Sequence, residues 1–273
     1  MKKPFDVSGR VALITGAGSG IGRAVAQSLA ARGCNVALAD IDAAGMAETS
    51  RMIGSLSRVT MHNLDVSNAE AIAALPVEVV SAQGSVDILV NNAGVAVGGT
   101  FEQVPEEDFE WLLSINLFGV IRMTRAFLPE LRKRPEARLI NVSSILGIVA
   151  TPKSAAYCTS KFGVRGFSEV LRHELAAEGS SVGVSVVHPG GVRTAIVDNA
   201  RSSASVSIED VNDERQRQSN LLRMTPQRAG EIIVEGIEKR RSRILVGTDA
   251  KLISIVERIM PVSYWSVMQR VMK

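Results

Sequence analysis

The 273-residue sequence is long enough for one large α/β domain and leaves little room for a second. Hydrophobic residues make up 46% of it and charged residues 22%, a balance typical of a globular enzyme with a substantial buried core. The net charge of +3 is small and the basic residues are interspersed with acidic ones, which argues against a nucleic-acid-binding surface.

Short apolar runs alternate along the chain with longer segments of helical periodicity. The runs are nearly continuous in Val, Ile and Leu, as expected for parallel strands that are buried on both faces. This alternation predicts right-handed βαβ units and a single doubly wound parallel sheet, a Rossmann-type α/β fold of about seven strands with helices on both faces. The expected strands are Val11–Thr15, Asn35–Asp40, Val59–Asn63, Val86–Asn91, Leu139–Val142, Val182–His188 and Ile244–Val246. The expected helices include Ile21–Arg32, Asn68–Gln83, Glu106–Arg132 and Thr159–Glu178.

A glycine-rich loop, Thr15–Gly22, follows the first strand and opens the first helix. Its glycines permit a tight turn, bring the backbone close to phosphate, and point free N–H groups from the helix N-terminus. The alternative is an ordinary strand–helix turn, but the strand before it and the acidic residue downstream favour a dinucleotide pyrophosphate site. The residues expected to bind the cofactor here are Gly16, Ser19, Gly20, Ile21 and Gly22.

Asp40 closes the second strand, at roughly the 20-residue spacing from the glycines that a ribose-binding acid has. Its carboxylate can accept hydrogen bonds from both ribose hydroxyls of NAD and would repel the 2′-phosphate of NADP. No Lys or Arg adjoins it in the sequence, so we expect NAD in preference to NADP. The alternative is that Asp40 or Asp42 caps the next helix, which we expect of Asp42.

Tyr157 and Lys161 are four residues apart, and on a helix this spacing places both side chains on one face. A free tyrosine has a pKa of about 10, too high for a general base at neutral pH. A cation on the same face favours the phenolate and lowers the pKa of the phenol toward the working range. Such pairs also arise by chance, so this one predicts a catalytic acid or base only together with the motifs around it.

The ordered set of motifs resembles the short-chain dehydrogenase/reductase family, in its compact form of about 250 residues. The resemblance is dense over residues 8–195 and looser over 225–247. It rests on Thr15–Gly22, Asp65-Val66, Asn91–Gly94, Asn116, Ser143-Ser144, Tyr157 with Lys161, and Pro189–Thr194.

The resemblance implies roles for four catalytic residues. Tyr157 would donate a proton to a carbonyl oxygen or take one from an alcohol, and Lys161 would also hydrogen-bond the nicotinamide ribose. Ser144, rather than the neighbouring Ser143, would hold the substrate oxygen where charge develops. Asn116, within the helix expected at 106–132, would anchor a water that relays protons to Lys161; its alternative is a satisfied structural amide.

Further cofactor contacts are implied at the carboxyl ends of later strands, where open α/β sheets bind ligands. Asp65 and Val66 would contact the adenine, and the less favoured alternative for Asp65 is a loop cap. Three residues after the fourth strand would lie along the cofactor, and four residues after the sixth would border the nicotinamide. These residues are Asn92, Ala93 and Gly94, then Pro189, Gly190, Val192 and Thr194.

The chain is expected to divide into a catalytic domain, residues 1–248, and an amphipathic tail, residues 249–273. A long polar segment, 196–224, lies within the domain and is interpreted as a lid. In the tail, an apolar row recurs at helical spacing, and Pro261 is expected to break that helix; the row is Leu252, Ile255, Val256, Ile259 and Met260. Three interpretations stay open: packing over the substrate pocket, a subunit contact, or a membrane-surface anchor, with packing on protein favoured.

We therefore expect an oxidoreductase that transfers a hydride between NAD(H) and a secondary alcohol or ketone, with a hydrophobic small-molecule substrate. The alternatives are an NADPH-dependent 3-oxoacyl thioester reductase and a catalytically silent nucleotide-binding sensor. No metal site is expected, because His173 and His188 lack ligand partners at metal spacing. The small net charge likewise gives no reason to expect a nucleic-acid partner. The resemblance implies a homodimer or homotetramer. Two isolated cysteines, no signal-like start and no run of about 18 apolar residues indicate a cytoplasmic protein, with peripheral membrane contact through the tail as the alternative.

Overall fold

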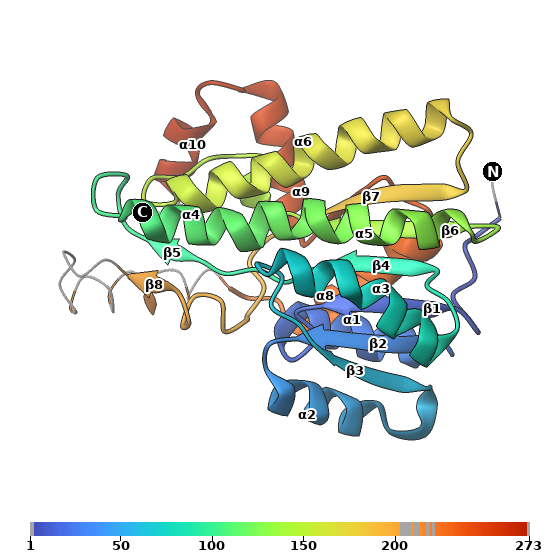
Figure 1. Ribbon diagram of the computed structural model, residues 1–273. Helices are drawn as coiled ribbons and strands as arrows, with labels where there is room; N and C mark the ends of the chain where they lie inside the picture. Colours follow the sequence, from blue (N-terminus) through green and yellow to red (C-terminus); the bar gives the residue numbers. More distant parts are fainter. Residues whose placement is uncertain are drawn as a thin grey trace.

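The protein is described from a computed structural model, which covers residues 3–202, 209, 213, 215, 216, 219 and 222–271. Within these residues seven parallel strands form one sheet, in the order β3-β2-β1-β4-β6-β7-β9 (Figure 1). The predicted doubly wound α/β fold is confirmed. The strands are β1 (Val11–Thr15), β2 (Asn35–Asp40), β3 (Val59–Asn63), β4 (Ile88–Asn91), β6 (Ala137–Val142), β7 (Val182–Pro189) and β9 (Arg243–Val246).

Helices connect the strands at close to the expected positions. The helix expected from Thr159 begins four residues earlier, at Ala155, so that Tyr157 and Lys161 lie on the same helix. The helices are α1 (Gly20–Ala30), α2 (Ala43–Ile53), α3 (Ala69–Gln83), α4 (Glu106–Leu113), α5 (Val120–Arg132), α6 (Ala155–Ala177) and α8 (Pro226–Glu238), with short turns η1 (Gly54–Leu56) and η3 (Ile145–Gly147).

The segment expected as one helix, Glu106–Arg132, is helical throughout but widens into a π-helical turn, η2 (Ser114–Gly119), between α4 and α5. Among the described residues it is also the one helical run long and apolar enough to cross a membrane, a weak indication that core helices share. In this fold α5 buries Met123, Phe127 and Leu131 against the sheet. Core packing therefore accounts for part of its apolar character.

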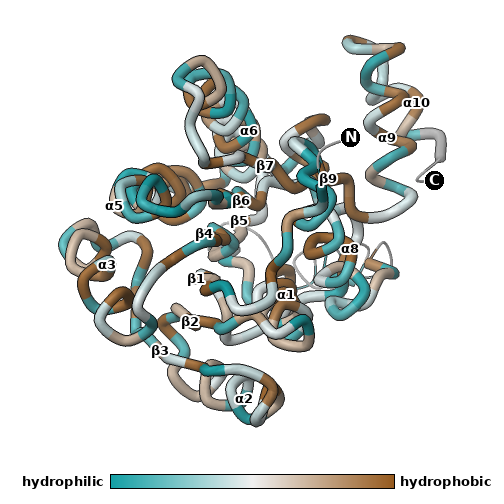
Figure 2. The backbone as a smooth tube through the Cα atoms, turned by 90° about the vertical axis from the view of Figure 1, so that its right-hand side faces the viewer, coloured by the Kyte–Doolittle hydropathy of each residue, from teal (hydrophilic) through white to brown (hydrophobic). Residues whose placement is uncertain are grey.

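Two hydrophobic layers hold the helices against the sheet (Figure 2). One layer joins α1 and α8 to one face, through side chains such as Val25, Leu29 and Ile233. The other joins α3, α5 and α6 to the opposite face, through side chains such as Leu75, Phe127 and Leu175. Every residue of β1 and β6 is buried, which is why these strands read as continuous apolar runs.

A second, two-stranded sheet lies beyond the carboxyl edge of the main one. It pairs β5 (Val97–Gly98) with β8 (Arg201–Ser202), and so attaches the start of the expected lid to the segment after β4. Of the lid expected at 196–224, residues 203–208, 210–212, 214, 217, 218, 220 and 221 lie outside the described residues.

The tail forms two helices, α9 (Thr248–Ile259) and α10 (Tyr264–Val271), which stand at one side of the molecule (Figure 2). The predicted break near Pro261 is confirmed. Leu252, Ile255 and Ile259 of the apolar row are 63%, 56% and 73% exposed, whereas Val256 and Met260 of the same row are half-buried, so only part of the row packs on the body and the three interpretations stay open. Ala250 is the one fully buried residue of α9, and Ile253 and Val256 further along the helix are half-buried.

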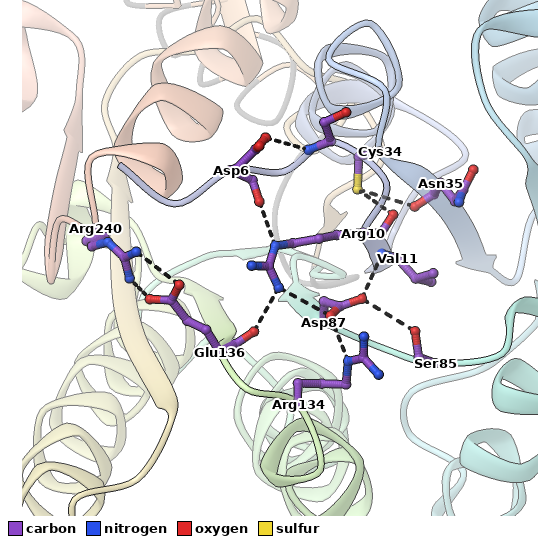
Figure 3. Close-up of polar contacts among 11 residues, drawn as sticks. Asp6, Arg10, Val11, Cys34, Asn35, Ser85, Asp87, Arg134, Glu136 and Arg240 are labelled. Atoms are coloured by element: carbon purple, nitrogen blue, oxygen red, sulfur yellow. Dashed lines mark hydrogen bonds and ion pairs between the residues drawn. The ribbon is translucent and has the colours of Figure 1, made fainter. Parts of the chain in front are cut away.

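The amino-terminal edge of the sheet carries a cluster of ion pairs around Asp87 (Figure 3). The buried carboxylate accepts hydrogen bonds from Arg134 Nε (2.8 Å), Arg10 Nη1 (3.4 Å) and the backbone N–H of Val11 (3.0 Å). Arg10 also donates to the backbone oxygen of Glu136 (3.0 Å), whose carboxylate pairs with Arg240. These contacts tie together the beginnings of β1, β4 and β6, at the opposite edge from the candidate active site.

Candidate active site

The glycine-rich loop joins the carboxyl end of β1 to α1, where the strand order reverses between β1 and β4. The Asn92 amide donates hydrogen bonds to the backbone oxygens of Thr15 (3.0 Å) and Gly16 (3.2 Å). A Cβ atom at Gly22 would collide with the Gly16 backbone oxygen, so only glycine permits this close approach. The loop therefore lies tight against the strand ends, as a pyrophosphate site requires.

The first turn of α1 has backbone N–H groups available for an anion. Its N-cap residue, Ser19, makes no side-chain capping hydrogen bond, and the turn contains no acidic residue. Thr194, from the segment after β7, lies against Gly20, with its Cγ2 3.2 Å from where a Cβ would be. These features fit the diphosphate of a nicotinamide dinucleotide, which binds helix N-termini through N–H groups and the positive end of the helix dipole.

Asp40 ends β2 with a carboxylate that backbone N–H groups hold in place. Its Oδ2 accepts a hydrogen bond from Gly18 (2.8 Å) and its Oδ1 from Asp42 (3.0 Å). Each oxygen keeps a further lone pair that a ribose hydroxyl can use. Asp42 itself caps α2 by accepting from the Gly45 N–H (2.9 Å), as predicted.

Arg23 reaches the same region, which the sequence did not indicate. Its guanidinium donates to the backbone oxygens of Gly18 and Gly45, and its Nε donates to Thr49 Oγ1 (2.9 Å). The cation therefore binds the outer side of the glycine loop and ties α1 to α2. It comes near Asp40 only through the packing of these two helices, so the neighbours of Asp40 in the sequence could not reveal it.

Tyr157, in the first turn of α6, meets Ser144, which follows β6. Their side chains share a hydrogen bond, and Ser144 Oγ also accepts from the backbone N–H of Leu146 (3.1 Å) at the start of η3. Burial raises the pKa of Tyr157 to about 12, and the hydrogen bond with Ser144 opposes this shift. The direction is opposite to the lowering expected from Lys161, because desolvation of the phenolate outweighs the stabilising contacts.

Lys161 lies one turn further along α6 and is only 3% exposed. Its Nζ donates to the backbone oxygen of Val142 (3.1 Å) and lies 5.5 Å from the centroid of the Tyr157 ring. Burial lowers the pKa of Lys161 to about 8. No carboxylate pairs with it among the described residues, so its charge is not neutralised by a nearby anion there.

Asn116 lies in the π-helical turn η2 and is fully buried. Its Oδ1 accepts from the backbone N–H of Val95 (2.8 Å), and its Nδ2 donates to the Val95 oxygen (2.9 Å). A Cβ on Gly94 would lie 3.2 Å from Asn116 Oδ1 and 3.6 Å from Lys161 Nζ. The structure therefore brings Asn116, Gly94 and Lys161 together, and the amide holds the segment after β4. Single π-turns are frequent at functional sites.

Other expected cofactor residues have contacts that give them structural roles. Asp65 caps a turn by accepting from the N–H (2.8 Å) and Oγ (2.7 Å) of Ser67, which is the alternative raised for it. Val66 is buried against Gly119. Thr15 Oγ1, which the sequence did not single out, accepts from the N–H groups of Asn92 (3.0 Å) and Ala93 (3.1 Å). A direct cofactor contact from Asp65, Val66 or Ala93 stays a prediction.

The segment after β7 returns across the same edge. Gly190 donates its N–H to Val246 (2.9 Å), and Val192 is buried beside Met224, with which it forms a β-bridge. This path carries the segment from Pro189 to the Gly20 contact of Thr194 described above. The four residues expected to border the nicotinamide thus lie between the Ser144 loop and the start of α1.

An apolar cluster surrounds Tyr157 on the side of the small sheet. It contains the buried residues Val97, Leu112 and Ala156, with further side chains packed around them: Val95, Val104, Phe109, Trp111 and Leu113. Arg201, at the start of the expected lid, covers the cluster, with its guanidinium 3.5 Å from the Trp111 ring centroid. No group of three or more potential metal ligands occurs in the part of the chain that the structure describes.

Comparison with known proteins identifies the family. A family model described as short chain dehydrogenase matches residues 10–205, which is most of the chain. The chain belongs to the short-chain dehydrogenase/reductase family. It is thus an oxidoreductase with a nicotinamide-dinucleotide site, and the family resemblance inferred from its motifs is confirmed.

Several members of the family are similar over most of their length. "Putative oxidoreductase SadH" of Mycobacterium tuberculosis is 38% identical over 257 residues, which cover 94% of this chain and 92% of that protein. A short-chain dehydrogenase/reductase from Burkholderia phymatum in complex with NAD has a TM-score of 0.87 at 30% identity, covering 93% and 94% of the two chains. An alcohol dehydrogenase from Thermococcus sibiricus complexed with 5-hydroxy-NADP has a TM-score of 0.73 at 25% identity, covering 86% and 95%. Members of the family therefore bind either NAD or NADP.

Proposed function

We propose that this short-chain dehydrogenase transfers a hydride between NAD(H) and a secondary alcohol or ketone, with Tyr157 as the acid or base. The observation that carries the proposal is the Tyr157–Ser144 hydrogen bond beside a buried, cationic Lys161. This group lies at the carboxyl edge of the sheet, next to a glycine loop and helix N-terminus shaped for a diphosphate. Bound NAD or NADH would supply the carbon that accepts or gives the hydride.

The protein's own residues would manage the proton. In ketone reduction, Tyr157 donates its hydroxyl proton to the carbonyl oxygen, and Ser144 donates a hydrogen bond to the same oxygen as negative charge develops. The raised pKa of Tyr157 keeps that proton in place at neutral pH. In alcohol oxidation the phenol must lose its proton, and the Lys161 charge favours the phenolate. Asn116 holds the adjoining segment and would anchor a water that carries protons to Lys161.

The cofactor is proposed to be NAD in preference to NADP. Asp40 offers an anionic carboxylate where the adenosine ribose would lie. Arg23, the cation found on the outer side of the loop, is already bound to backbone oxygens and Thr49, so it is not free to pair with a 2′-phosphate. Equilibrium binding of NADH and NADPH tests this. We expect Asp40→Ala to weaken NADH binding about tenfold, because charge-assisted hydrogen bonds to the ribose are lost. The difference in affinity between NADH and NADPH should become smaller. Equal affinity in the native protein would refute the preference.

The substrate is proposed to be hydrophobic. The side chains that surround Tyr157 beyond the catalytic hydroxyls are apolar, and the cluster is closed by the small β5–β8 sheet. An apolar surface favours the bulky part of a long-chain or ring-containing alcohol by about 25 cal/mol for each Å² removed from water. A secondary alcohol within such a molecule would place its oxygen at Ser144 and Tyr157.

Two other functions remain distinguishable by experiment. An NADPH-dependent 3-oxoacyl thioester reductase would need the same hydroxyl pair but a site that tolerates a 2′-phosphate. A catalytically silent sensor would bind the dinucleotide without turnover, and it would not need Asn116, Ser144, Tyr157 and Lys161 brought together as they are.

For assembly we propose a homodimer or homotetramer of cytoplasmic subunits. A groove of about 390 Å³ between α5 and α6 is lined by Ile121, Leu128, Phe167 and Leu171, and Val170 is exposed nearby. The exposed row of the tail suits a subunit contact, with a lipid surface as the alternative. The division into residues 1–248 and 249–273 rests on the sparse contact of α9 with the body.

The decisive experiment is a panel of alcohols and ketones followed by NADH absorbance, with NAD(H) and NADP(H) in parallel. We expect turnover of long-chain or polycyclic secondary alcohols with NAD, and weaker turnover of small polar ones. A preference for small polar alcohols would overturn the hydrophobic substrate. Turnover of acyl thioesters with NADPH alone would favour the reductase, and binding without any turnover would favour the sensor.

A further inference from the structure

The tail rests on the body through few contacts, yet two of them fall on loops of the candidate active site. α9 adjoins β9 and the short turn η3, which directly follows Ser144. Apart from half-buried apolar side chains, the hairpin is attached to the body by hydrogen bonds at the starts of α9 and α10. Those bonds are made by Asp249 and Tyr264.

Asp249, in the first turn of α9, is bound to the segment after β7. Its Oδ2 accepts a hydrogen bond from the backbone N–H of Gly191 (2.6 Å). The carboxylate also fills the space beside Gly190, where a Cβ would collide with it. A side chain at position 190 would displace the Asp249 carboxylate from this place.

Tyr264, at the start of α10, is bound to the end of the serine loop, which we define as residues 144–150. Its hydroxyl oxygen accepts from the backbone N–H of Ala150 (2.8 Å) and can donate to the Ala150 carbonyl (3.4 Å). These are contacts between residues 114 positions apart in the chain. The first residue of the same loop is the proposed substrate-binding Ser144.

The serine loop is in turn bound to β7. His188, the residue before Pro189, donates from Nδ1 to the backbone oxygen of Ser144 (2.8 Å). Since a carbonyl can only accept, the proton must be on Nδ1, and the buried Nε2 is left without a partner among the described residues. Burial lowers the pKa of His188 to about 4, so the ring stays neutral and keeps this single tautomer.

These three bonds form a closed ring of segments. The serine loop is joined to the end of β7 by His188, the segment after β7 is joined to the tail by Asp249, and the tail is joined back to the serine loop by Tyr264. Because the ring is closed, each of the three segments is bonded to both of the others. Movement of any one of them is therefore restrained by two contacts.

We propose that His188, Asp249 and Tyr264 are positioning residues, and that the tail sets the distance between the Ser144–Tyr157 pair and the nicotinamide-side segment Gly190–Thr194. The inference rests on the proposed function, because it assigns the ring a role in placing the substrate oxygen against the cofactor. A displacement of about 1 Å at such a site can lower the rate about a hundredfold. The tail therefore acts on catalysis without touching the reacting atoms.

The experiment compares Tyr264→Phe and Asp249→Ala with Val262→Ala, a matched control on the same hairpin whose side chain is 92% exposed. We expect Tyr264→Phe and Asp249→Ala each to lower kcat/KM about tenfold, which is less than the hundredfold loss that a 1 Å displacement can cause. The affinity for NADH should stay within about twofold of the native value. Val262→Ala should leave both unchanged.

Amide hydrogen exchange supplies a readout that does not depend on turnover. Removing Tyr264 Oη should speed exchange at Ala150, its direct partner, and also at Gly191, which it does not touch. Asp249→Ala should have the reciprocal effect on Ala150. Faster exchange only at the directly bonded amide, with kcat/KM unchanged, would overturn the ring.

A substitution pair at His188 tests the third bond. His188→Asn can still present an N–H to the Ser144 oxygen, whereas His188→Leu cannot. We expect the Asn variant to keep most of the activity and the Leu variant to lose it about tenfold or more. Equal activity of the two variants would remove His188 from the ring. If the native protein oxidises no alcohol at all, the proposed function fails, but the exchange measurements still decide the ring.

Discussion

The two edges of the parallel sheet treat charged and polar groups in opposite ways. At the amino-terminal edge, the buried carboxylate of Asp87 accepts hydrogen bonds from two arginines, a backbone N–H and Ser85, so its charge is paired with cations (Figure 3). At the carboxyl edge, Lys161 is as deeply buried, but within the described part of the chain its Nζ donates to the Val142 carbonyl and no carboxylate pairs with it.

The pKa values reflect this contrast. Burial lowers the pKa of Lys161 to about 8 and raises that of Tyr157 to about 12, so the protein disfavours the charged form of both groups. Such incomplete compensation is destabilising in itself, and it is retained where chemistry needs a proton to move. We infer that the first edge serves stability and the second serves function.

Lys161→Met is the strongest test of this contrast between the two edges, because it should lower kcat and raise the free energy of unfolding. Loss of the cation should lower kcat at least a hundredfold, within the range of general acid–base contributions. Removal of a buried, uncompensated ammonium should raise the free energy of unfolding at pH 7 by about 1–2 kcal/mol, after subtracting the lost hydrogen bond to Val142. Steady-state kinetics and urea unfolding measure the two effects. A less stable variant would contradict the account.

Asp87→Asn should have the reverse outcome. The neutral amide leaves Arg10 and Arg134 without their anion and cannot satisfy all the donors that the carboxylate accepts. We expect the free energy of unfolding to fall by about 3 kcal/mol, toward the low end for breaking a buried pair because both arginines are partly exposed. Turnover per folded molecule should match the native protein. A selective loss of kcat with unchanged stability would show that this edge is not merely structural.

The pH dependence of the free energy of unfolding tests the cost of burying the Lys161 charge, with a smaller expected effect. Because the folded-state pKa of Lys161 is about 8 against an ordinary 10.5, the unfolded chain binds more protons between these values. The penalty is fully present below pH 8 and is relieved as the pH rises toward 10.5, so stability should increase over this window. Tyr157, with its pKa raised from 10.0 to about 12, opposes this only above pH 10.

The matched measurement uses Lys161→Met, in which the rise between pH 8 and 10 should vanish. Urea unfolding at several pH values in both proteins provides the comparison. An equal rise in the two proteins would assign the effect to other groups.

The sequence predicted the sheet and the site where the signal is local. Strand runs such as Val11–Thr15 and Asn35–Asp40 agree with the structure because burial on both faces leaves a continuous apolar pattern. The glycine loop could be predicted from the sequence because its backbone conformation requires glycine at fixed positions. The start of α6 was misplaced by four residues, although Ser154, a favoured N-cap residue type, directly precedes it.

Contacts between residues that are far apart in the chain could not be predicted from the sequence. Thr15 supports Asn92 and Ala93, and Asp249 and Tyr264 reach loops 58 and 114 residues away, through packing that no spacing encodes. The tail was recognised as amphipathic, but the sequence did not show that Leu252, Ile255 and Ile259 stay exposed or that Asp249 and Tyr264 bind loops of the body. The pKa of Tyr157 was also misjudged, because the sequence shows the nearby cation but not the degree of burial.

The most direct test of the central claim is turnover by Tyr157→Phe, followed by NADH absorbance with the best alcohol of the panel and accompanied by NADH titration. The substitution removes one hydroxyl and keeps the ring that packs against Val97 and Leu112. We expect kcat to fall by about a thousandfold or more while NADH affinity stays within about twofold, because the missing group moves the proton. Activity that survives the loss of this hydroxyl would contradict the account.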